Sequence, residues 1–163
     1  MKKWYLCLLL FVILSSCKRS LVDNVVFEIK HTCADPIVSV CVVDIQKVTN
    51  FKWDTMYLFK DWTFSDSISK AIGFSYDGSD VPDDYSRILF IRNKKVVYEE
   101  DFIASDYNKS TINFYSVMDI LSKVKISYIT SSKAIFNVRT GKYENSCKDC
   151  FVYSLTNAIA IDK

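Results

Sequence analysis

The sequence of 163 residues has little that breaks or loosens a chain, since it holds only three glycines and two prolines. It contains no low-complexity tract and no glycine-rich phosphate loop, which argues against a disordered protein and against a nucleotide-binding loop. His31 is the single histidine, so most Ser-His and Cys-His nucleophile arrangements are excluded unless His31 itself is the base. A formal net charge of +2 gives no reason to expect a nucleic-acid partner.

The N-terminus is the most informative segment. Two lysines follow Met1, an unbroken apolar run extends from Trp4 to Leu14, and two serines come next. A charged start, a short apolar core and small residues are typical of a secretory signal. The run is too short for a membrane-spanning helix, which needs roughly 20 residues. Residues 1–16 are therefore predicted to be a signal peptide.

Leu14-Ser15-Ser16-Cys17 resembles the lipobox of bacterial lipoproteins. This resemblance implies that Cys17 becomes the first mature residue and takes a diacylglycerol, often with a further acyl chain on its amine. The alternative is an ordinary cysteine after an ordinary signal peptide. Lys18 is not the aspartate that resembles an inner-membrane retention signal. The expected location is the bacterial cell envelope, with the outer membrane facing the periplasm favoured if the cell has two membranes.

Composition of the mature chain predicts one folded, strand-rich domain. Removing residues 1–16 takes away Lys2 and Lys3 and no acid, which leaves 19 basic and 19 acidic residues. Abundant aromatic residues, together with recurring Val, Ile and Tyr, fit a pleated and half-buried surface. Residues 17–24 are expected to form the lipidated N-terminus and a short tether, and residues 25–163 a single globular domain.

The hydrophobic pattern predicts an α+β fold, mainly an antiparallel sheet of seven to eight strands with one short helix. An all-β sandwich or barrel with one helix is the alternative. The helix is expected to start with a Thr63 hydroxyl cap and to end at Gly73. It is expected to carry an apolar stripe of Phe64, Ile68 and Ile72. A turn is expected at residues 34–36. The expected strands are Val25–Lys30, Val38–Ile45, Trp53–Phe59, a hairpin of Arg87–Arg92 with Val96–Asp101, Thr111–Ser116, and a hairpin of Ala134–Val138 with Phe151–Leu155.

Three segments together look like a group of small bacterial lipoproteins: Phe51 to Phe59 with its Phe-x-Trp-Asp motif, the helix closed by Gly73, and Leu89 to Tyr98. The resemblance implies a shared anchored domain and brings no activity or site with it. On the strand itself, Trp53, Tyr57 and Phe59 are expected to share one face. Either that face belongs to the core and Asp54 caps a turn or binds backbone amides, or an exposed Trp53 or Trp62 forms a docking surface.

Four cysteines remain after Cys7 leaves with the signal and Cys17 takes lipid: Cys33, Cys41, Cys147 and Cys150. An even number outside the cytoplasm predicts two disulfides, for which three pairings are open and the local pairs are favoured. Cys147-Lys148-Asp149-Cys150 also has the spacing of a redox motif, but strand-like residues follow it where such a motif needs a helix. Phe151 excludes haem attachment, and the spacing between Cys33 and Cys41 is too wide for a usual zinc site.

Acidic residues give no specific site. Asp77, Asp80, Asp83 and Asp84 lie in one predicted loop, but Pro82 stands where a calcium-binding EF-hand loop needs glycine. No spacing selects a pair of carboxylates for hydrolysis.

The chain is therefore expected to be a membrane-anchored, non-catalytic binding protein of the envelope, in a specific version an inhibitor or immunity-type protein. The expected partners are the membrane, through the lipid, and an envelope protein, with no nucleic acid, metal or cofactor other than the lipid on Cys17. The alternative function is a small envelope enzyme, either a carboxylate hydrolase or a thiol oxidoreductase using Cys147 and Cys150.

Overall fold

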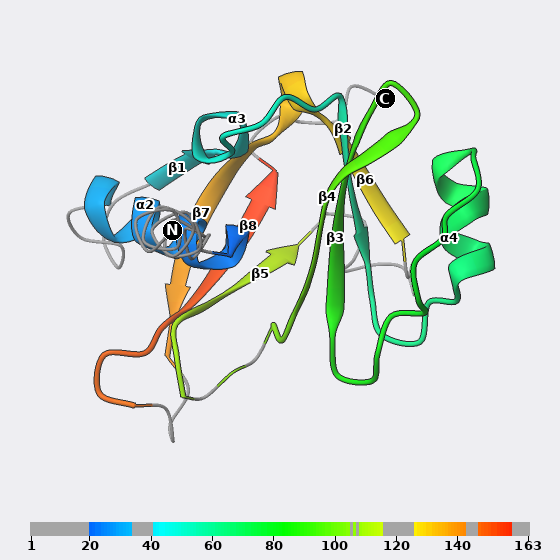
Figure 1. Ribbon diagram of the computed structural model, residues 1–163. Coiled ribbons are helices and arrows are strands. Elements are labelled where there is room, and N and C mark those ends of the chain that lie inside the picture. The colour runs from blue at the N-terminus through cyan, green and yellow to red at the C-terminus, as the bar shows by residue number, and fades with distance from the viewer. Residues whose placement is uncertain are drawn as a thin grey trace, which may run out of the picture.

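The computed structural model describes residues 20–33, 41–104, 106, 108–115, 126–142 and 147–157. These residues form two four-stranded, mostly antiparallel sheets that face one another, together with three α-helices (Figure 1). The α+β class predicted from the sequence is confirmed, and neither sheet closes into a barrel.

Sheet A has the strand order β1-β7-β8-β5. The predicted C-terminal hairpin is confirmed, because β7 and β8 pair antiparallel. The fourth strand, β5, instead runs parallel to β8, with Thr111 opposite Val152. The bounds of these strands are β1 Cys41–Asp44, β5 Thr111–Tyr115, β7 Ile135–Gly141 and β8 Val152–Asn157.

Sheet B has the strand order β4-β3-β2-β6. The predicted hairpin is confirmed, and its two-residue turn is Asn93-Lys94, with φ values of 50° and 56° as a primed hairpin turn requires. Strand β6 was not predicted and pairs with β2. The bounds are β2 Thr55–Phe59, β3 Ser86–Arg92, β4 Lys95–Phe102 and β6 Ile126–Thr130.

The predicted strand Val25–Lys30 is wrong, because helix α2 covers Leu21–Thr32. The Ser20 hydroxyl accepts a hydrogen bond of 3.0 Å from the Asp23 amide and caps the first turn. Leu21, Val22, Val25, Val26 and Ile29 form one buried face of the helix, which outweighs the strand preference of single valines. Residues 21–24, expected in the tether, therefore belong to the folded domain.

Two further helices flank sheet B and the end of β1. Helix α3 (Ile45–Val48) begins where the predicted strand Val38–Ile45 was expected to finish, and the expected turn at residues 34–36 lies outside the described residues. Helix α4 (Ser65–Ile72) ends at Gly73 with a φ of 79°, as predicted. Its expected cap is wrong: Phe64 occupies the N-cap position, and the Thr63 hydroxyl donates to the Lys60 carbonyl instead.

Sheet B packs against other elements on both of its faces. Its first face and the inner face of sheet A enclose the larger hydrophobic core together with α2, and its second face packs against α4. Every residue of β3 from Arg87 to Ile91 is consequently buried. Ile88 and Phe90 point into the larger core, whereas Leu89 and Ile91 belong to the cluster under α4. This two-sided burial explains the continuous apolar run of this strand.

Within the part of the chain that the structure describes, no helix is long and apolar enough to span a membrane.

Candidate binding site at the aromatic end of sheet B

Two loops meet at the end of sheet B where β2 ends and β3 begins. They are residues 60–64, between β2 and α4, and residues 73–85, between α4 and β3. The Val81 amide donates to the Thr63 carbonyl over 2.9 Å, and the Ser65 amide donates to the Asp80 carboxylate over 2.7 Å. These bonds hold the loops side by side, and Asp80 supplies the cap that α4 lacks locally.

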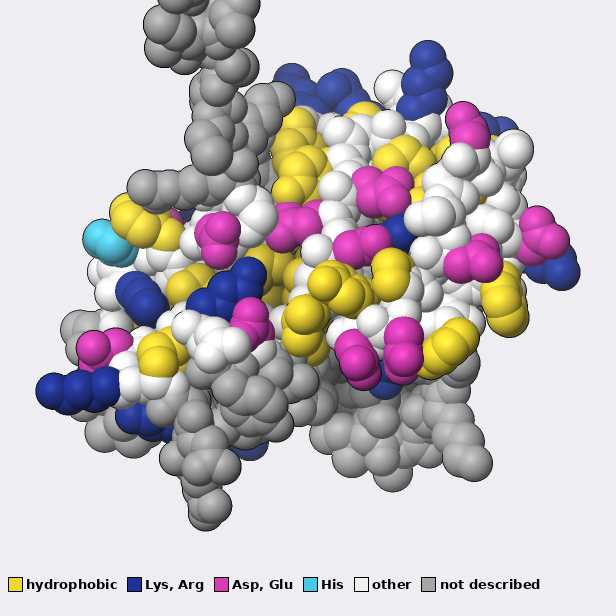
Figure 2. Space-filling view, turned by 60° about the horizontal axis from the view of Figure 1, so that its bottom comes forward, with side chains coloured by type: hydrophobic (Ala, Val, Ile, Leu, Met, Phe, Trp, Pro, Cys, Tyr) yellow, Lys and Arg dark blue, Asp and Glu magenta, His cyan; other side chains and the backbone are white. Residues whose placement is uncertain are grey.

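These loops expose three aromatic side chains, which define the aromatic end. Trp62 is 57% exposed, Phe64 is 60% exposed and Tyr85 is 36% exposed. Figure 2 looks towards this part of the molecule and shows hydrophobic and acidic side chains gathered on it. Exposed tryptophan and tyrosine are favoured at protein interfaces, because each combines a large apolar area with a polar group. The aromatic end is thus the best candidate for a binding surface among the described residues.

Trp62 is held in an unfavourable backbone conformation. Its φ is 58°, in the left-handed region that costs a residue with a side chain about 1–2 kcal/mol. Asp84, on the neighbouring loop, has a φ of 64°. Thr63, which follows Trp62, is buried and hydrogen-bonded through both its hydroxyl and its carbonyl. The surrounding bonds therefore maintain a strained turn that leaves the indole in solvent.

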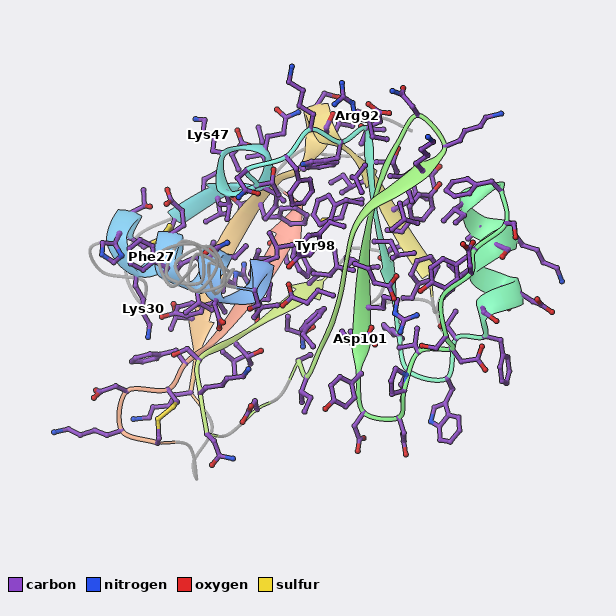
Figure 3. The ribbon with its side chains drawn as sticks, in the orientation of Figure 1. Phe27, Lys30, Lys47, Arg92, Tyr98 and Asp101 are labelled. Atoms are coloured by element: carbon purple, nitrogen blue, oxygen red, sulfur yellow. A yellow bond between two sulfur atoms is a disulfide. The ribbon has the colours of Figure 1, made fainter. Side chains whose placement is uncertain are left out.

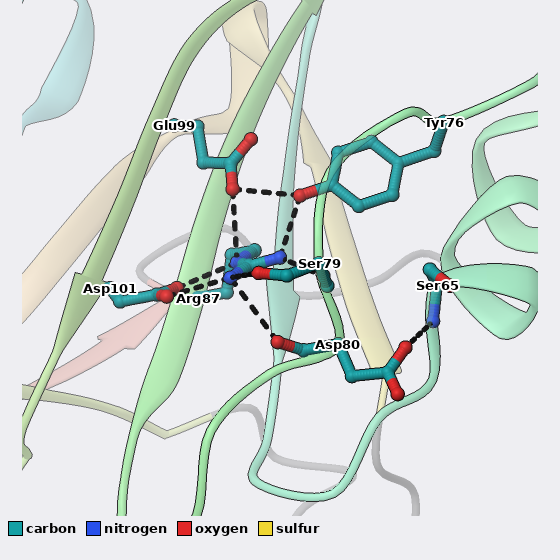
Figure 4. A network of polar contacts seen from close by, with 7 residues as sticks. All are labelled: Ser65, Tyr76, Ser79, Asp80, Arg87, Glu99 and Asp101. Carbon is teal, nitrogen blue, oxygen red and sulfur yellow. Dashed lines mark hydrogen bonds and ion pairs between the residues drawn. The ribbon is translucent and has the colours of Figure 1, made fainter.

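A buried cation fixes the second loop to the sheet. Arg87 of β3 is 1% exposed and donates two hydrogen bonds, of 2.6 and 2.7 Å, to the two carboxylate oxygens of Asp101 on β4 (Figure 4). The same guanidinium donates to the Tyr76 hydroxyl over 2.6 Å and to the Ser79 carbonyl. Glu99 completes the network by accepting from Tyr76 over 2.7 Å. A bidentate arginine–carboxylate pair of this kind is both strong and directional.

This network keeps one charge state near neutral pH. Burial, followed by the hydrogen bond to Glu99, raises the pKa of Tyr76 well above its usual range, so this phenol stays protonated. The hydrogen bond to Asp101 is the largest effect that raises the pKa of Arg87, which remains a cation. The arrangement therefore serves as a rigid support for the loop rather than as an acid–base pair.

Acidic side chains surround the aromatic end. Segment 60–85 holds six acids and two bases, which gives a formal charge of −4. The bases are Lys60 and Lys70, and the acids are Asp61, Asp66, Asp77, Asp80, Asp83 and Asp84. Among the described residues, no three Asp, Glu, His or Cys side chains come close enough to share a metal ion. The acids thus surround the exposed aromatic rings with negative charge.

The two tryptophans considered from the sequence have opposite environments. Trp53 is 5% exposed and packs edge-on against Phe90, so a partner cannot reach it as the docking hypothesis required. It belongs to the larger core, whereas Tyr57 and Phe59 face α4, because β2 begins only at Thr55. The Asp54 carboxylate accepts from the Asn93 amide over 2.9 Å and so caps the hairpin turn, as the alternative hypothesis predicted.

The cysteines are paired locally, as favoured from the sequence. Cys33–Cys41 joins the end of α2 to β1, and its eight-residue separation corresponds to about 2–3 kcal/mol in the chain-entropy account. Cys147–Cys150 closes a turn before β8, with a Cα–Cα distance of 5.1 Å. Because strand β8 follows this pair, no helix N-terminus is present to activate its thiols. Cys17, the predicted lipidation site, lies outside the described residues.

Strand β4 uses its other face to hold α2. Glu100 accepts from the Leu21 amide over 2.6 Å and from the Val22 amide over 3.5 Å, and the Tyr98 hydroxyl accepts from Leu21 over 3.0 Å. Burial and the hydrogen bond to Glu100 raise the pKa of Tyr98 to about 12. Figure 3 shows Tyr98 between β4 and α2. The start of α2 is therefore fixed to sheet B.

His31 was expected on a strand and instead lies in the last turn of α2. Its Nδ1 lies 2.8 Å from the Phe27 carbonyl oxygen, and its ring packs on that of Phe27 with centroids 3.9 Å apart. These contacts with Phe27 fix the position of the imidazole.

Sequence reasoning named Trp62 but missed Phe64, Tyr85 and Arg87. Phe64 was assigned to the apolar stripe of α4, yet it precedes the helix and points into solvent. Arg87 could have been found from the hairpin, because an in-register hairpin places it directly opposite Asp101. A charged residue at a position buried on both faces requires such a partner.

The fold and the site together define a two-sheet α+β domain with an exposed aromatic end supported by a buried ion network. Comparison of the chain with protein-family models, with curated proteins and with solved structures finds no match. The function must therefore be inferred from the residues themselves.

Proposed function

We propose that this chain is a lipid-anchored, non-catalytic binding protein of the bacterial cell envelope that presents its aromatic end to a protein partner. The observation that supports it most directly is the exposure of Trp62, Phe64 and Tyr85 on loops fixed by the buried Arg87 network. Rigid presentation lowers the entropy lost on binding, and exposed aromatic anchors supply the largest contributions at protein interfaces.

The anchor would be a diacylglycerol, with or without an N-acyl chain, on Cys17. Helix α2 begins at Leu21, so only residues 18–20 separate the lipid from the folded domain. Stable anchoring requires two membrane-binding signals, and the two chains of a diacylglycerol supply them. The protein would accordingly act at the membrane surface, and at the outer membrane if the cell has one.

The partner is expected to combine an apolar centre with a basic rim. The three aromatic side chains would fill the centre, and the exposed acids Asp66, Asp77 and Asp83 would face the rim. Complementary charge at the rim increases the association rate and excludes wrong partners, whereas buried aromatic contacts provide affinity. An inhibitor or immunity-type role, in which a small protein blocks a basic enzyme or toxin at the membrane, fits this chemistry.

Site-specific cross-linking in cells tests the proposal. A photoreactive benzoylphenylalanine would replace Trp62, and a control would place it at Tyr128, which is 70% exposed on strand β6. We expect one discrete cross-linked species from position 62 and none from position 128. The species should disappear in the background of Asp77→Lys with Asp83→Lys. Equal cross-linking from both positions, or a product indifferent to those charges, would contradict the proposal.

A further inference from the structure

Sheet B carries a second charged surface, at the end opposite the aromatic end. The Asp54 amide donates to the Ile91 carbonyl over 2.8 Å, and the Ser131 amide donates to the Asp54 carbonyl over 2.9 Å. The Ile45 amide in turn donates to the Ala134 carbonyl over 3.0 Å. Segments 44–54, 92–95 and 130–134 therefore meet at the start of β2, at the top of Figure 1.

This surface, the basic end, holds six exposed cations. Figure 3 shows Lys47 and Arg92 at the same end of the molecule. The two acids in the same segments, Asp44 and Asp54, accept hydrogen bonds from backbone amides, of Gln46 and Asn93 respectively. The formal charge is +4, equal and opposite to that of segment 60–85. The cations are Lys47, Lys52, Arg92, Lys94, Lys95 and Lys133.

The start of the described chain lies close to the basic end. The Leu21 amide is bonded to Tyr98 and Glu100, and Tyr98 is three positions along β4 from Lys95. Three strand residues span about 10 Å, and the stretch from Cys17 to Leu21 reaches at most about 14 Å. A lipid on Cys17 therefore holds the domain where the cations of the basic end can reach the bilayer surface. Lys18 and Arg19 add two more cations beside the lipid.

We propose that the basic end docks on the anionic lipid headgroups of the membrane that holds the anchor, and so directs the aromatic end away from it. This inference rests on the proposed lipid anchor. A basic surface near a membrane gains attraction from each lysine or arginine within about a Debye length, roughly 8 Å at physiological ionic strength. The acidic aromatic end would be repelled by the same headgroups. The segregated charges thus select one orientation.

The test uses the full-length lipoprotein, reconstituted into vesicles of phosphatidylcholine alone and into vesicles that also contain phosphatidylglycerol. A water-soluble amine reagent labels exposed lysines, and mass spectrometry measures labelling at each position. We expect labelling of Lys52, Lys94 and Lys95 to fall several-fold in the anionic vesicles and to recover in high salt. Lys70, an exposed residue of α4, is the internal control and should be labelled equally in both vesicles.

A double variant tests the same surface with the same labelling measurement. Lys94→Glu with Lys95→Glu should abolish the several-fold protection of Lys52, whereas Lys70→Glu should leave it unchanged. Equal labelling in both kinds of vesicle overturns the docking proposal. Protection of the lysines in native membranes but not in vesicles of lipid alone also overturns it, because it would indicate an acidic protein partner. Flotation with phosphatidylcholine vesicles tests the anchor separately. A protein that does not float with these vesicles would contradict the lipid on Cys17, whereas the lysine labelling would still test the docking proposal.

Discussion

The two ends of sheet B differ in the charged and aromatic side chains that they expose and bury. At the basic end, the aromatic side chains turn inward, with Trp53 buried in the core, and six cations face solvent. At the aromatic end, Trp62 and Phe64 are exposed among acids, and the one buried charge is the cation Arg87. The acids Asp44 and Asp54 of the basic end accept hydrogen bonds from backbone amides, and the buried Arg87 binds carboxylates beside the aromatic end. The small formal net charge of the chain, +2, therefore conceals two ends of formal charge +4 and −4.

Strand β4 connects the two ends because its successive side chains point to opposite faces of sheet B. Glu99 and Asp101 point to the side of α4 and bind Arg87, which supports the aromatic end. Tyr98 and Glu100 point to the opposite side and hold the start of α2, which leads to the predicted anchor. One short segment thus couples the position of the N-terminus to the loops that present the aromatic residues.

The largest effect is expected from Arg87→Met. Removing the buried cation takes the guanidinium away from Asp101 and the Ser79 carbonyl and leaves Glu99 with Tyr76 alone. This should lower the free energy of unfolding by about 3–5 kcal/mol. Arg92→Met, on the same strand but exposed, should change it by less than about 0.5 kcal/mol. Urea unfolding of both variants measures the difference, and equal losses would show that the network does not support the aromatic end.

Trp62→Ala should affect binding and leave stability almost unchanged. Loss of an aromatic anchor from the centre of an interface costs about 2 kcal/mol or more, a factor of about 30 in affinity. Tyr128→Ala removes a still more exposed ring from β6 and should leave affinity for the cross-linked partner intact. Titration of the partner against both variants measures this, and a similar loss in the two would remove the distinction between the aromatic end and the rest of the surface.

Glu100→Gln should loosen the start of α2. The amide cannot provide the negative charge that favours a helix N-terminus, so the expected loss is about 0.5–1 kcal/mol. Hydrogen exchange should become faster at Leu21 and Val22 and stay the same at Ile68, in the distant helix α4. Unchanged exchange at Leu21 would indicate that Glu100 does not tie the N-terminus to sheet B.

The raised pKa of Tyr98 predicts a small effect on stability that appears only at alkaline pH. Its pKa rises from 10.0 to about 12 on folding, so the folded state holds this proton more tightly than the unfolded state does. Stability from this group is complete below pH 10 and is lost as the pH rises towards about 12. Between pH 9 and pH 12, the free energy of unfolding measured in urea should therefore fall less steeply for Tyr98→Phe than for the unsubstituted protein. An identical slope in the variant would argue against the buried Tyr98–Glu100 contact.

The sequence predicted the parts of the fold that depend on neighbouring residues. The hairpin at Asn93-Lys94, the helix ending at Gly73 and both local disulfides are all determined by short-range patterns. Helix α2 also had a local signal, since Ser20 and Asp23 have the spacing of a capping motif, but residues 18–24 were assigned to a tether. The parallel pairing of β5 with β8 and the position of β6 depend on distant contacts that no local pattern encodes.

The candidate site was predicted only in part for the same reason. Trp62 could be named from its residue type, but its exposure depends on the loop 73–85 that lies beside it. Segregation of charge was hidden because Lys52, Arg92 and Lys133 come from three separate segments that only the folded sheet brings together.

The orientation of the two ends can be measured directly. A single fluorescent amino acid would be placed at position 94 or at position 62 of the full-length protein bound to anionic vesicles, and these vesicles would carry a quencher attached to lipid headgroups. We expect strong quenching at position 94 and little at position 62. Equal quenching at both positions, or stronger quenching at position 62, would contradict an account in which the basic end faces the membrane and the aromatic end faces its partner.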